Sequence, residues 1–99
     1  MPYAQLTIRS PQGGQQIYRI EKAIVKIGRQ LDNDIIVPDK STGRHHAVIE
    51  YQQNGQFTLT DLQSTNGTTV NKIPVIRPHT LRTNDVVGIG KYEFLFERR

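Results

Sequence analysis

Residues 47–60 read AVIEYQQNGQFTLT, and this stretch indicates the fold class. Apolar and polar residues alternate on both sides of Asn54-Gly55, as in two half-buried β-strands. Asn and Gly tolerate the positive φ angles of a tight reversal, so the pair predicts a β-hairpin. The same alternation recurs in residues 6–8, 17–20, 24–27, 86–89 and 92–96. We therefore expect an all-β fold, an antiparallel β-sandwich of two sheets.

The composition limits the size and chemistry of the domain. The 99 residues, without an internal repeat, suffice for one domain with one core, which we place at residues 1–99 and expect to be part of a larger protein. The absence of Cys excludes a disulfide framework, a thiolate metal site and a Cys nucleophile. No apolar run approaches the roughly 20 residues of a membrane span, and the first residues lack the pattern of a secretory signal. We expect a cytoplasmic domain without membrane insertion.

The net charge is +4, with thirteen basic and nine acidic residues. Such a modest excess favours an anionic partner without choosing between a phosphoprotein and a nucleic acid. Interleaved aromatic and basic residues on one face are not evident among seven aromatics, so we do not expect nucleic-acid binding.

Turns and loops separate the expected strands. Gly13-Gly14 is expected to join the first two strands, and Gly90-Lys91 the last two. Residues 38–43 and 64–67 are rich in Ser, Thr, Asn and Gly and predict longer loops. Function is to be sought in these loops, because loops on a rigid scaffold carry most binding residues.

Three polar segments lie between strands: Gly28-Arg29, residues 41–46 and residues 64–68. Alternate loops of a sandwich gather at one end, so these segments are expected to converge. The guanidinium groups of Arg29 and Arg44 would meet phosphate oxygens in two-pronged hydrogen bonds. The backbone amides of the glycine-containing loops, at Gly43 and Gly67, would add further donors.

These segments resemble the signature of the forkhead-associated (FHA) domain in order and spacing. The matching stretches are residues 27–29 with 33–35, residues 44–47 and residues 61–68. The resemblance continues through Val70-Asn71, Leu81, Asp85 and Ile89-Gly90, and it covers the chain from about Tyr18 to Glu97. It implies a β-sandwich of about eleven strands that binds phosphothreonine peptides through loops at one end, with little tolerance for phosphoserine and no catalysis.

The resemblance also implies residue roles. Arg29 would contact the phosphate and Arg44 the phosphate or the peptide, while Thr65 would donate its hydroxyl and Asn66 would hold the peptide backbone. Three further residues would keep the loops in shape: Gly28, His46 and Gly67.

The chain departs from the family at Gly43, where the pattern has a Ser three residues before His46. We expect Thr42 or Ser41 to supply a hydroxyl instead, or the Gly43 amide to act alone, with weakened phosphate binding. The alternative is a degenerate FHA module that acts independently of phosphate, as an interaction or regulatory domain of a larger protein, for example a kinase or an ABC-type transporter ATPase. Lesser departures are Lys72 and Asn84, which stand where the family often has Gly.

Other chemistries fit the sequence poorly. His45 and His46 are adjacent and would point to opposite faces of a strand, so they are not expected to chelate one metal ion. Asp32-Asn33-Asp34 lacks the Gly of a calcium loop and predicts a turn. No acid, base and nucleophile occur together. We expect a monomeric, cofactor-free binding domain, not an enzyme, whose partner is a protein or peptide that contains phosphothreonine.

Overall fold

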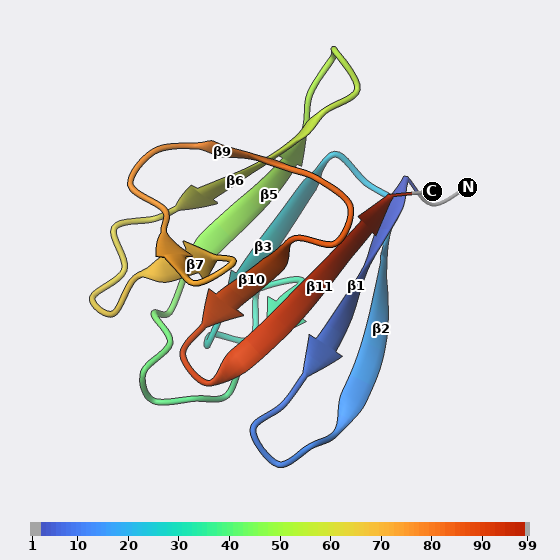
Figure 1. Cartoon of the computed structure of the whole chain (residues 1–99). Coiled ribbons are helices and arrows are strands. Elements are labelled where there is room, and N and C mark those ends of the chain that lie inside the picture. Colours follow the sequence, from blue (N-terminus) through green and yellow to red (C-terminus); the bar gives the residue numbers. More distant parts are fainter. Residues whose placement is uncertain (1–2, 99) are drawn as a thin grey trace.

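The computed structural model describes residues 3–98, which form eleven β-strands (Figure 1). The strands are β1 (Ala4–Arg9), β2 (Gln15–Ile20), β3 (Ile24–Gly28), β4 (Ile35–Ile36), β5 (Ala47–Tyr51), β6 (Phe57–Asp61), β7 (Thr68–Val70), β8 (Ile73–Pro74), β9 (His79–Leu81), β10 (Val86–Ile89) and β11 (Tyr92–Arg98). No helix in this part of the chain is long and apolar enough to cross a membrane.

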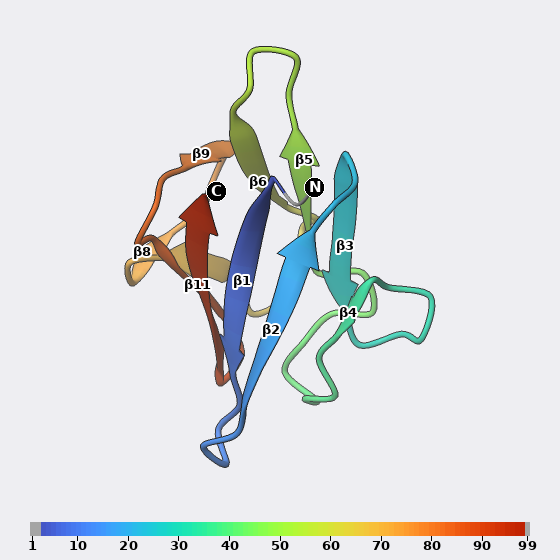
Figure 2. The ribbon, with the colours of Figure 1, turned by 90° about the vertical axis from the view of Figure 1, so that its right-hand side faces the viewer.

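The strands form two sheets. One has the order β2-β1-β11-β10-β7-β8, and the other has the order β4-β3-β5-β6-β9. All pairings are antiparallel except β3 with β4, which is parallel. In Figure 2 strands β11, β1 and β2 stand side by side in one layer, away from β5 and β6. The expected all-β sandwich of about eleven strands is confirmed.

The core lies between the sheets and follows from the alternation in the sequence. In β6, Phe57 and Leu59 are fully buried, whereas the intervening Thr58 is half-buried. The rings of Phe57 and Phe96, from opposite sheets, meet edge to face with centroids 5.3 Å apart. Burying a side chain of this size contributes about 1.5–3 kcal/mol, and aromatic pairing adds to it.

The three predicted hairpin turns are confirmed. Gly13, Gly55 and Gly90 adopt φ angles of +93°, +84° and +58° in the turns that join β1 to β2, β5 to β6 and β10 to β11. A fourth tight turn joins β7 to β8 at Asn71 and Lys72, whose φ angles of 52° and 70° are both positive.

The connections that follow β3, β4 and β6 gather at one end of the sandwich. These are residues 29–34 after β3, residues 37–46 before β5 and residues 62–67 after β6, which we call the rim loops. They lie at the lower left of Figure 1, at the other end from the start of β1 and the end of β11. The turn between β10 and β11 lies at the same end as the rim loops. The sandwich therefore has one end built from these loops.

Candidate functional site

Arg29 is held at the rim by the loop that precedes β5. Its backbone N–H donates to Gly43 O at 2.9 Å, and its side-chain Nε donates to Thr42 O at 3.1 Å. Since Nε is engaged, the two terminal nitrogens of the exposed guanidinium remain available for an external acceptor. The loop thus orients a fixed cation toward solvent.

Gly28 allows this close approach of two loops. A Cβ at Gly28 would lie 2.3 Å from Arg44 O and 2.8 Å from Asn33 Nδ2, distances that no side chain tolerates. The same carbonyl of Arg44 accepts hydrogen bonds from Asn33 Nδ2 at 2.8 Å and from Gln30 N at 3.2 Å. A residue larger than Gly would push residues 29–34 away from residues 37–46.

His46 connects two rim loops from inside the molecule. Its side chain is fully buried; Nδ1 accepts a hydrogen bond from Gly43 N at 2.8 Å, and Nε2 lies 2.9 Å from Gly67 O. These partners are satisfied together when the proton is on Nε2, which then donates to the Gly67 carbonyl. The imidazole fixes the spacing between residues 37–46 and residues 62–67.

Asp61, the last residue of β6, shapes the loop that carries Thr65 and Asn66. Its carboxylate accepts hydrogen bonds from Ser64 N, Ser64 Oγ and Thr68 Oγ1 at 3.0, 2.6 and 2.7 Å. Burial acts to raise the pKa of this carboxyl, but hydrogen bonds from Ser64 and Thr68 outweigh burial and hold the pKa below its ordinary 3.8. Thr65 and Asn66 project from this fixed turn and are exposed.

Asn66 reaches across to the neighbouring loop. Its Nδ2 donates to Ser41 O at 2.8 Å, which leaves Oδ1 to accept from a ligand N–H. The Thr65 hydroxyl makes no hydrogen bond with another residue of 3–98. Arg29 contacts Thr42 and Asn66 contacts Ser41, so the structure brings Arg29, Asn66 and the adjacent Thr65 to one region of the rim.

Arg44 is exposed at the same rim, and its side chain forms no hydrogen bond or ion pair within the described residues. The neighbouring His45 is also exposed, and it pairs with Asp32 at 3.1 Å. The predicted turn at Asp32-Asn33-Asp34 is present. Among residues 3–98 no three His, Cys, Asp or Glu side chains are grouped to hold a metal ion.

The structure corrects two expectations about how a phosphate would be met. The Gly43 amide donates to His46 and the Gly67 amide donates to Ser64 Oγ at 2.9 Å, so neither amide is free for a ligand. The Thr42 side chain is only 2% exposed, so its hydroxyl does not reach the rim. The Ser41 hydroxyl donates to Asp39 Oδ1 at 2.8 Å. Thr42 and Gly43 contribute their carbonyls, which orient Arg29.

Three residues have structural roles that the sequence did not reveal. The buried Asn33 ties residues 29–34 to Arg44, and Asp61 holds the loop after β6. Asp39 accepts hydrogen bonds from Ser41 and from Lys91 N, which attaches the turn between β10 and β11 to the rim. The usable signal is the residue type: Asp and Asn side chains in loops commonly form hydrogen bonds with backbone groups of nearby residues.

Comparison with known proteins gives a consistent result. The family model described as FHA domain matches residues 25–90. The glycogen accumulation regulator GarA of Mycobacterium tuberculosis is 36% identical over 88 residues, which cover 89% of this chain and 52% of GarA. This chain thus spans about half the length of that relative.

Solved structures agree with the sequence comparison. One from a study of phosphothreonine-dependent FHA domain interactions has a TM-score of 0.83 and 32% identity, covering 96% of this chain and 97% of the other. Mycobacterium tuberculosis EmbR, in complex with a low-affinity phosphopeptide, has a TM-score of 0.83 and 31% identity, covering 95% of this chain and 24% of EmbR.

Proposed function

Because this chain belongs to the FHA domain family, we propose that it binds phosphothreonine peptides through the rim loops and so mediates phosphorylation-dependent contacts between proteins. The observation that supports this proposal best is the shared anchoring of Arg29 and Asn66. Both side chains donate to carbonyls of the same loop, at Thr42 and Ser41, with Thr65 next to Asn66.

The chemistry of these groups suits a phosphate ester. A phosphate near neutral pH carries about −1.5 to −2 charges and three acceptor oxygens. The terminal nitrogens of Arg29 would donate to two of these oxygens, and the Thr65 hydroxyl would donate to the third. Because Arg29 is already oriented by Thr42 and Gly43, little side-chain entropy is lost on binding.

The remaining rim residues would hold the peptide rather than the phosphate alone. Asn66 Oδ1 is placed to accept a peptide N–H, since Nδ2 is bound to Ser41 O. Arg44 supplies a second exposed cation for the phosphate or for an acidic peptide residue. Gly28, His46 and Gly67 would act indirectly, by keeping the loops at their spacing.

This role requires no cofactor and no catalytic group. Relatives such as GarA extend well beyond the matched region, so the domain would serve as the recognition part of a longer protein. We place it in the cytoplasm, where protein kinases act, as a monomeric module that binds proteins and not nucleic acids.

The test is binding of a degenerate phosphothreonine peptide library, compared with the unphosphorylated library, by fluorescence anisotropy. Wild type is expected to bind only the phosphorylated library. Arg29→Ala is expected to weaken binding at least tenfold, because hydrogen bonds to a charged group contribute about 1.5–3 kcal/mol and 1.4 kcal/mol is tenfold.

The matched control is Arg77→Ala, which removes the same charge from an exposed residue between β8 and β9. Its affinity should equal that of wild type. Equal losses in both variants would indicate general charge attraction instead of a site at Arg29, and binding of both libraries alike would contradict the proposal.

A phosphate-independent interaction module is the second candidate, and it is favoured by the engaged Ser41 hydroxyl and the buried Thr42. A partner purified from cells would distinguish the two functions. Phosphatase treatment of that partner should abolish its binding if the proposed function holds, and it should leave binding unchanged for a phosphate-independent module.

A further inference from the structure

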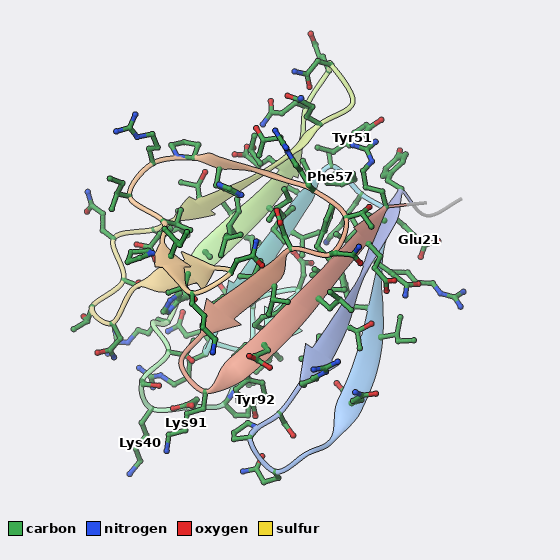
Figure 3. All side chains as sticks on the ribbon, in the orientation of Figure 1. Glu21, Lys40, Tyr51, Phe57, Lys91 and Tyr92 are labelled. Atoms are coloured by element: carbon green, nitrogen blue, oxygen red, sulfur yellow. The ribbon has the colours of Figure 1, made fainter. Side chains whose placement is uncertain are left out.

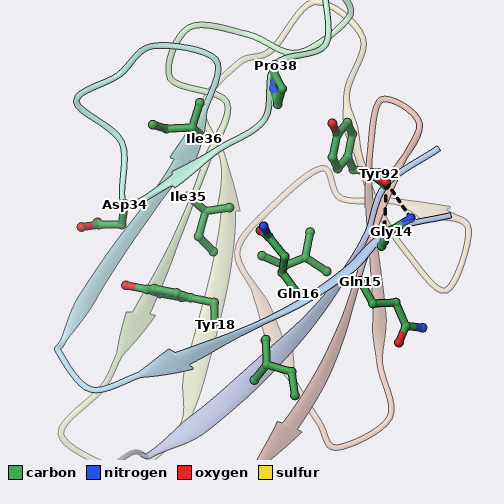
Figure 4. A pocket seen from close by; sticks show the side chains of 12 residues that line it. Gly14, Gln15, Gln16, Tyr18, Asp34, Ile35, Ile36, Pro38 and Tyr92 are labelled. Carbon is green, nitrogen blue, oxygen red and sulfur yellow. Dashed lines mark hydrogen bonds between the residues drawn. The ribbon is translucent and has the colours of Figure 1, made fainter. Parts of the chain in front are cut away.

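A hollow of about 620 Å³ opens between two edge strands, β2 of one sheet and β4 of the other (Figure 4). Ile35 and Gln16 face it from opposite sides, Tyr18 lies at one end beside Asp34, and Pro38 and Tyr92 lie toward the other end. Small-molecule and side-chain pockets typically measure about 300–1,000 Å³, so this hollow is large enough for a bulky side chain and the backbone that carries it.

The lining combines aliphatic surface with unpaired polar groups. Four isoleucines line the hollow, and two of them are notably exposed, Ile17 at 60% and Ile36 at 44%. The side chains of Gln16, Tyr18 and Tyr92 make no hydrogen bond with another residue of 3–98. Asp34, the one acidic residue in the lining, is paired with Lys22. The hollow therefore favours an apolar side chain accompanied by polar backbone groups.

The β2 border of the hollow offers backbone groups that no neighbouring strand uses. Ser10 and Gly14 form a hydrogen-bonded pair, in which Ser10 N donates to Gly14 O. The next pair along the two strands is Arg9 opposite Gln15, which is therefore a non-hydrogen-bonded pair. Hydrogen bonding alternates along an antiparallel pair, so Gln15, Ile17 and Arg19 direct their N–H and C=O away from β1. No strand pairs with this side of β2 among the described residues. An extended peptide can bind such an edge.

The hollow adjoins the rim loops. Ile36 pairs with Gly28, the residue before Arg29, and Pro38 belongs to the loop whose carbonyls orient Arg29. Tyr92 follows Lys91, whose N–H donates to Asp39 at 3.4 Å in that same loop. A peptide held at Arg29 and Asn66 can therefore continue into the hollow without leaving the protein surface.

We propose that this hollow binds a segment of the phosphothreonine peptide that flanks the phosphorylated residue, in extended conformation, with a branched aliphatic or aromatic side chain inserted between β2 and β4. This inference rests on the proposed function of the rim. Attachment through the phosphate raises the effective concentration of the flank at the hollow, so a contact too weak to bind alone adds to affinity.

The experiment compares two degenerate phosphothreonine libraries, one with about three residues on each side of the phosphothreonine and one with about eight, since an extended residue spans about 3.3 Å. Wild type is expected to bind the long library at least about tenfold tighter, as for one fully buried aliphatic side chain. Sequencing of the bound long peptides should show enrichment of Ile, Leu, Val, Phe or Tyr at one flanking position.

Two variants test the place of this contact. Ile17→Glu adds a charge at the mouth of the hollow, and Gln16→Trp fills it; neither residue is buried, so folding should persist. Each is expected to remove the advantage of the long library and to leave the affinity for the short library unchanged. The matched control is Ile73→Glu, at a 69% exposed residue of β8, the strand at the opposite edge of the same sheet as β2.

The outcomes separate this inference from the function on which it rests. Suppose that the short library binds in a phosphate-dependent manner. If the long library then binds no tighter, or if Ile17→Glu and Gln16→Trp keep the full affinity advantage of the long library, this inference alone is overturned. The inference is also overturned if Ile73→Glu loses the affinity advantage of the long library to the same extent as the two variants. Failure of the short library to bind in a phosphate-dependent manner would refute the proposed function and this inference together.

Discussion

Gly43 stands where the FHA signature implies a Ser, and its surroundings leave room for a side chain. A Cβ there would lie 3.5 Å from His46 Nδ1 and 3.6 Å from His46 Cα, which are ordinary van der Waals distances. We expect Gly43→Ser to raise the affinity for phosphothreonine peptides about tenfold, because the new hydroxyl would donate to the charged phosphate. Titration of one peptide against both proteins measures the gain.

The control for this substitution is Gly43→Ala, which adds the Cβ without the hydroxyl. Its affinity should match that of wild type, and its free energy of unfolding is expected to rise by about 0.4–1 kcal/mol because Ala restricts the unfolded chain more than Gly. An affinity for Gly43→Ser no higher than that for Gly43→Ala would show that a hydroxyl at this position does not meet the phosphate.

Individual side chains of the site were predictable from the sequence only where motif spacing identified them. Arg29, Thr65 and Asn66 follow the family pattern, and the structure places them at one rim. The occupation of the Gly43 amide by His46 was not predictable, since it depends on where a residue three positions away points after folding. The burial of Thr42 was not predictable for the same reason, since it also depends on how the loop folds.

The β7–β8 hairpin contains Lys72, a residue without the conformational freedom of Gly at a position where the family often has Gly. Lys72 has a φ of 70° in a two-residue turn, a conformation that Gly adopts without cost and that costs other residues about 1–2 kcal/mol. We expect Lys72→Gly to raise the free energy of unfolding by about 1 kcal/mol, measured by urea denaturation.

The matched control lies in the other lysine-containing turn. Lys91 follows Gly90 between β10 and β11, and its own φ is not positive. Lys91→Gly removes the same charge but relieves no strain, so it should destabilise the domain slightly through the greater freedom of the unfolded chain. Equal gains in both variants would assign the effect to charge.

The loop after β6 should depend on pH through Asp61. Hydrogen bonds in the folded state hold the pKa of this carboxyl below its ordinary 3.8 despite burial, so its contribution to stability is fully present above about pH 4 and is lost as pH falls through the folded-state value. We expect Asp61→Asn to lower the free energy of unfolding by about 1–3 kcal/mol at pH 7, with the difference shrinking toward pH 3.

Urea denaturation of both proteins at pH 7, 5, 4 and 3 measures this dependence. Asp32→Asn is the comparison, because the Asp32 carboxylate is exposed and its side-chain partner among residues 3–98 is the exposed His45. A difference between wild type and Asp61→Asn that stays constant from pH 7 to pH 3 would contradict the role of the ionised carboxylate.

Strands were predictable in proportion to their length. β1, β5, β6 and β11 have five to seven residues and show a clear alternation in the sequence. Strands β4, β7, β8 and β9 have only two or three residues, which is too short to display a period of two. They exist because neighbouring strands offer free hydrogen-bonding groups, and tertiary structure, not local sequence, decides that pairing.

Figure 3 shows the two ends of the domain. Lys40, Lys91 and Tyr92 lie at one end, and Tyr51, Phe57 and Glu21 lie at the other. The first and last described strands reach this second end, with Ala4 opposite Arg98. We expect a folded protein fused to either terminus to leave the affinity for phosphothreonine peptides within twofold of wild type, as measured by titration.

Insertions at the two ends of the sandwich provide the comparison. A short flexible segment inserted between Asn54 and Gly55, in the β5–β6 turn, should leave affinity unchanged. The same segment inserted between Thr65 and Asn66 should abolish binding. Similar affinities for the two insertions would contradict the assignment of recognition to the rim loops.

The adjacency of β1 and β11 also bears on how such a domain can be acquired in evolution. Residues opposite each other in an antiparallel pair are about 5 Å apart, so the polypeptide arrives and departs at nearly the same point. A host protein can accept the domain inside a surface loop without its own ends being forced apart. The recognition surface would then face outward from the host, whichever loop received the domain.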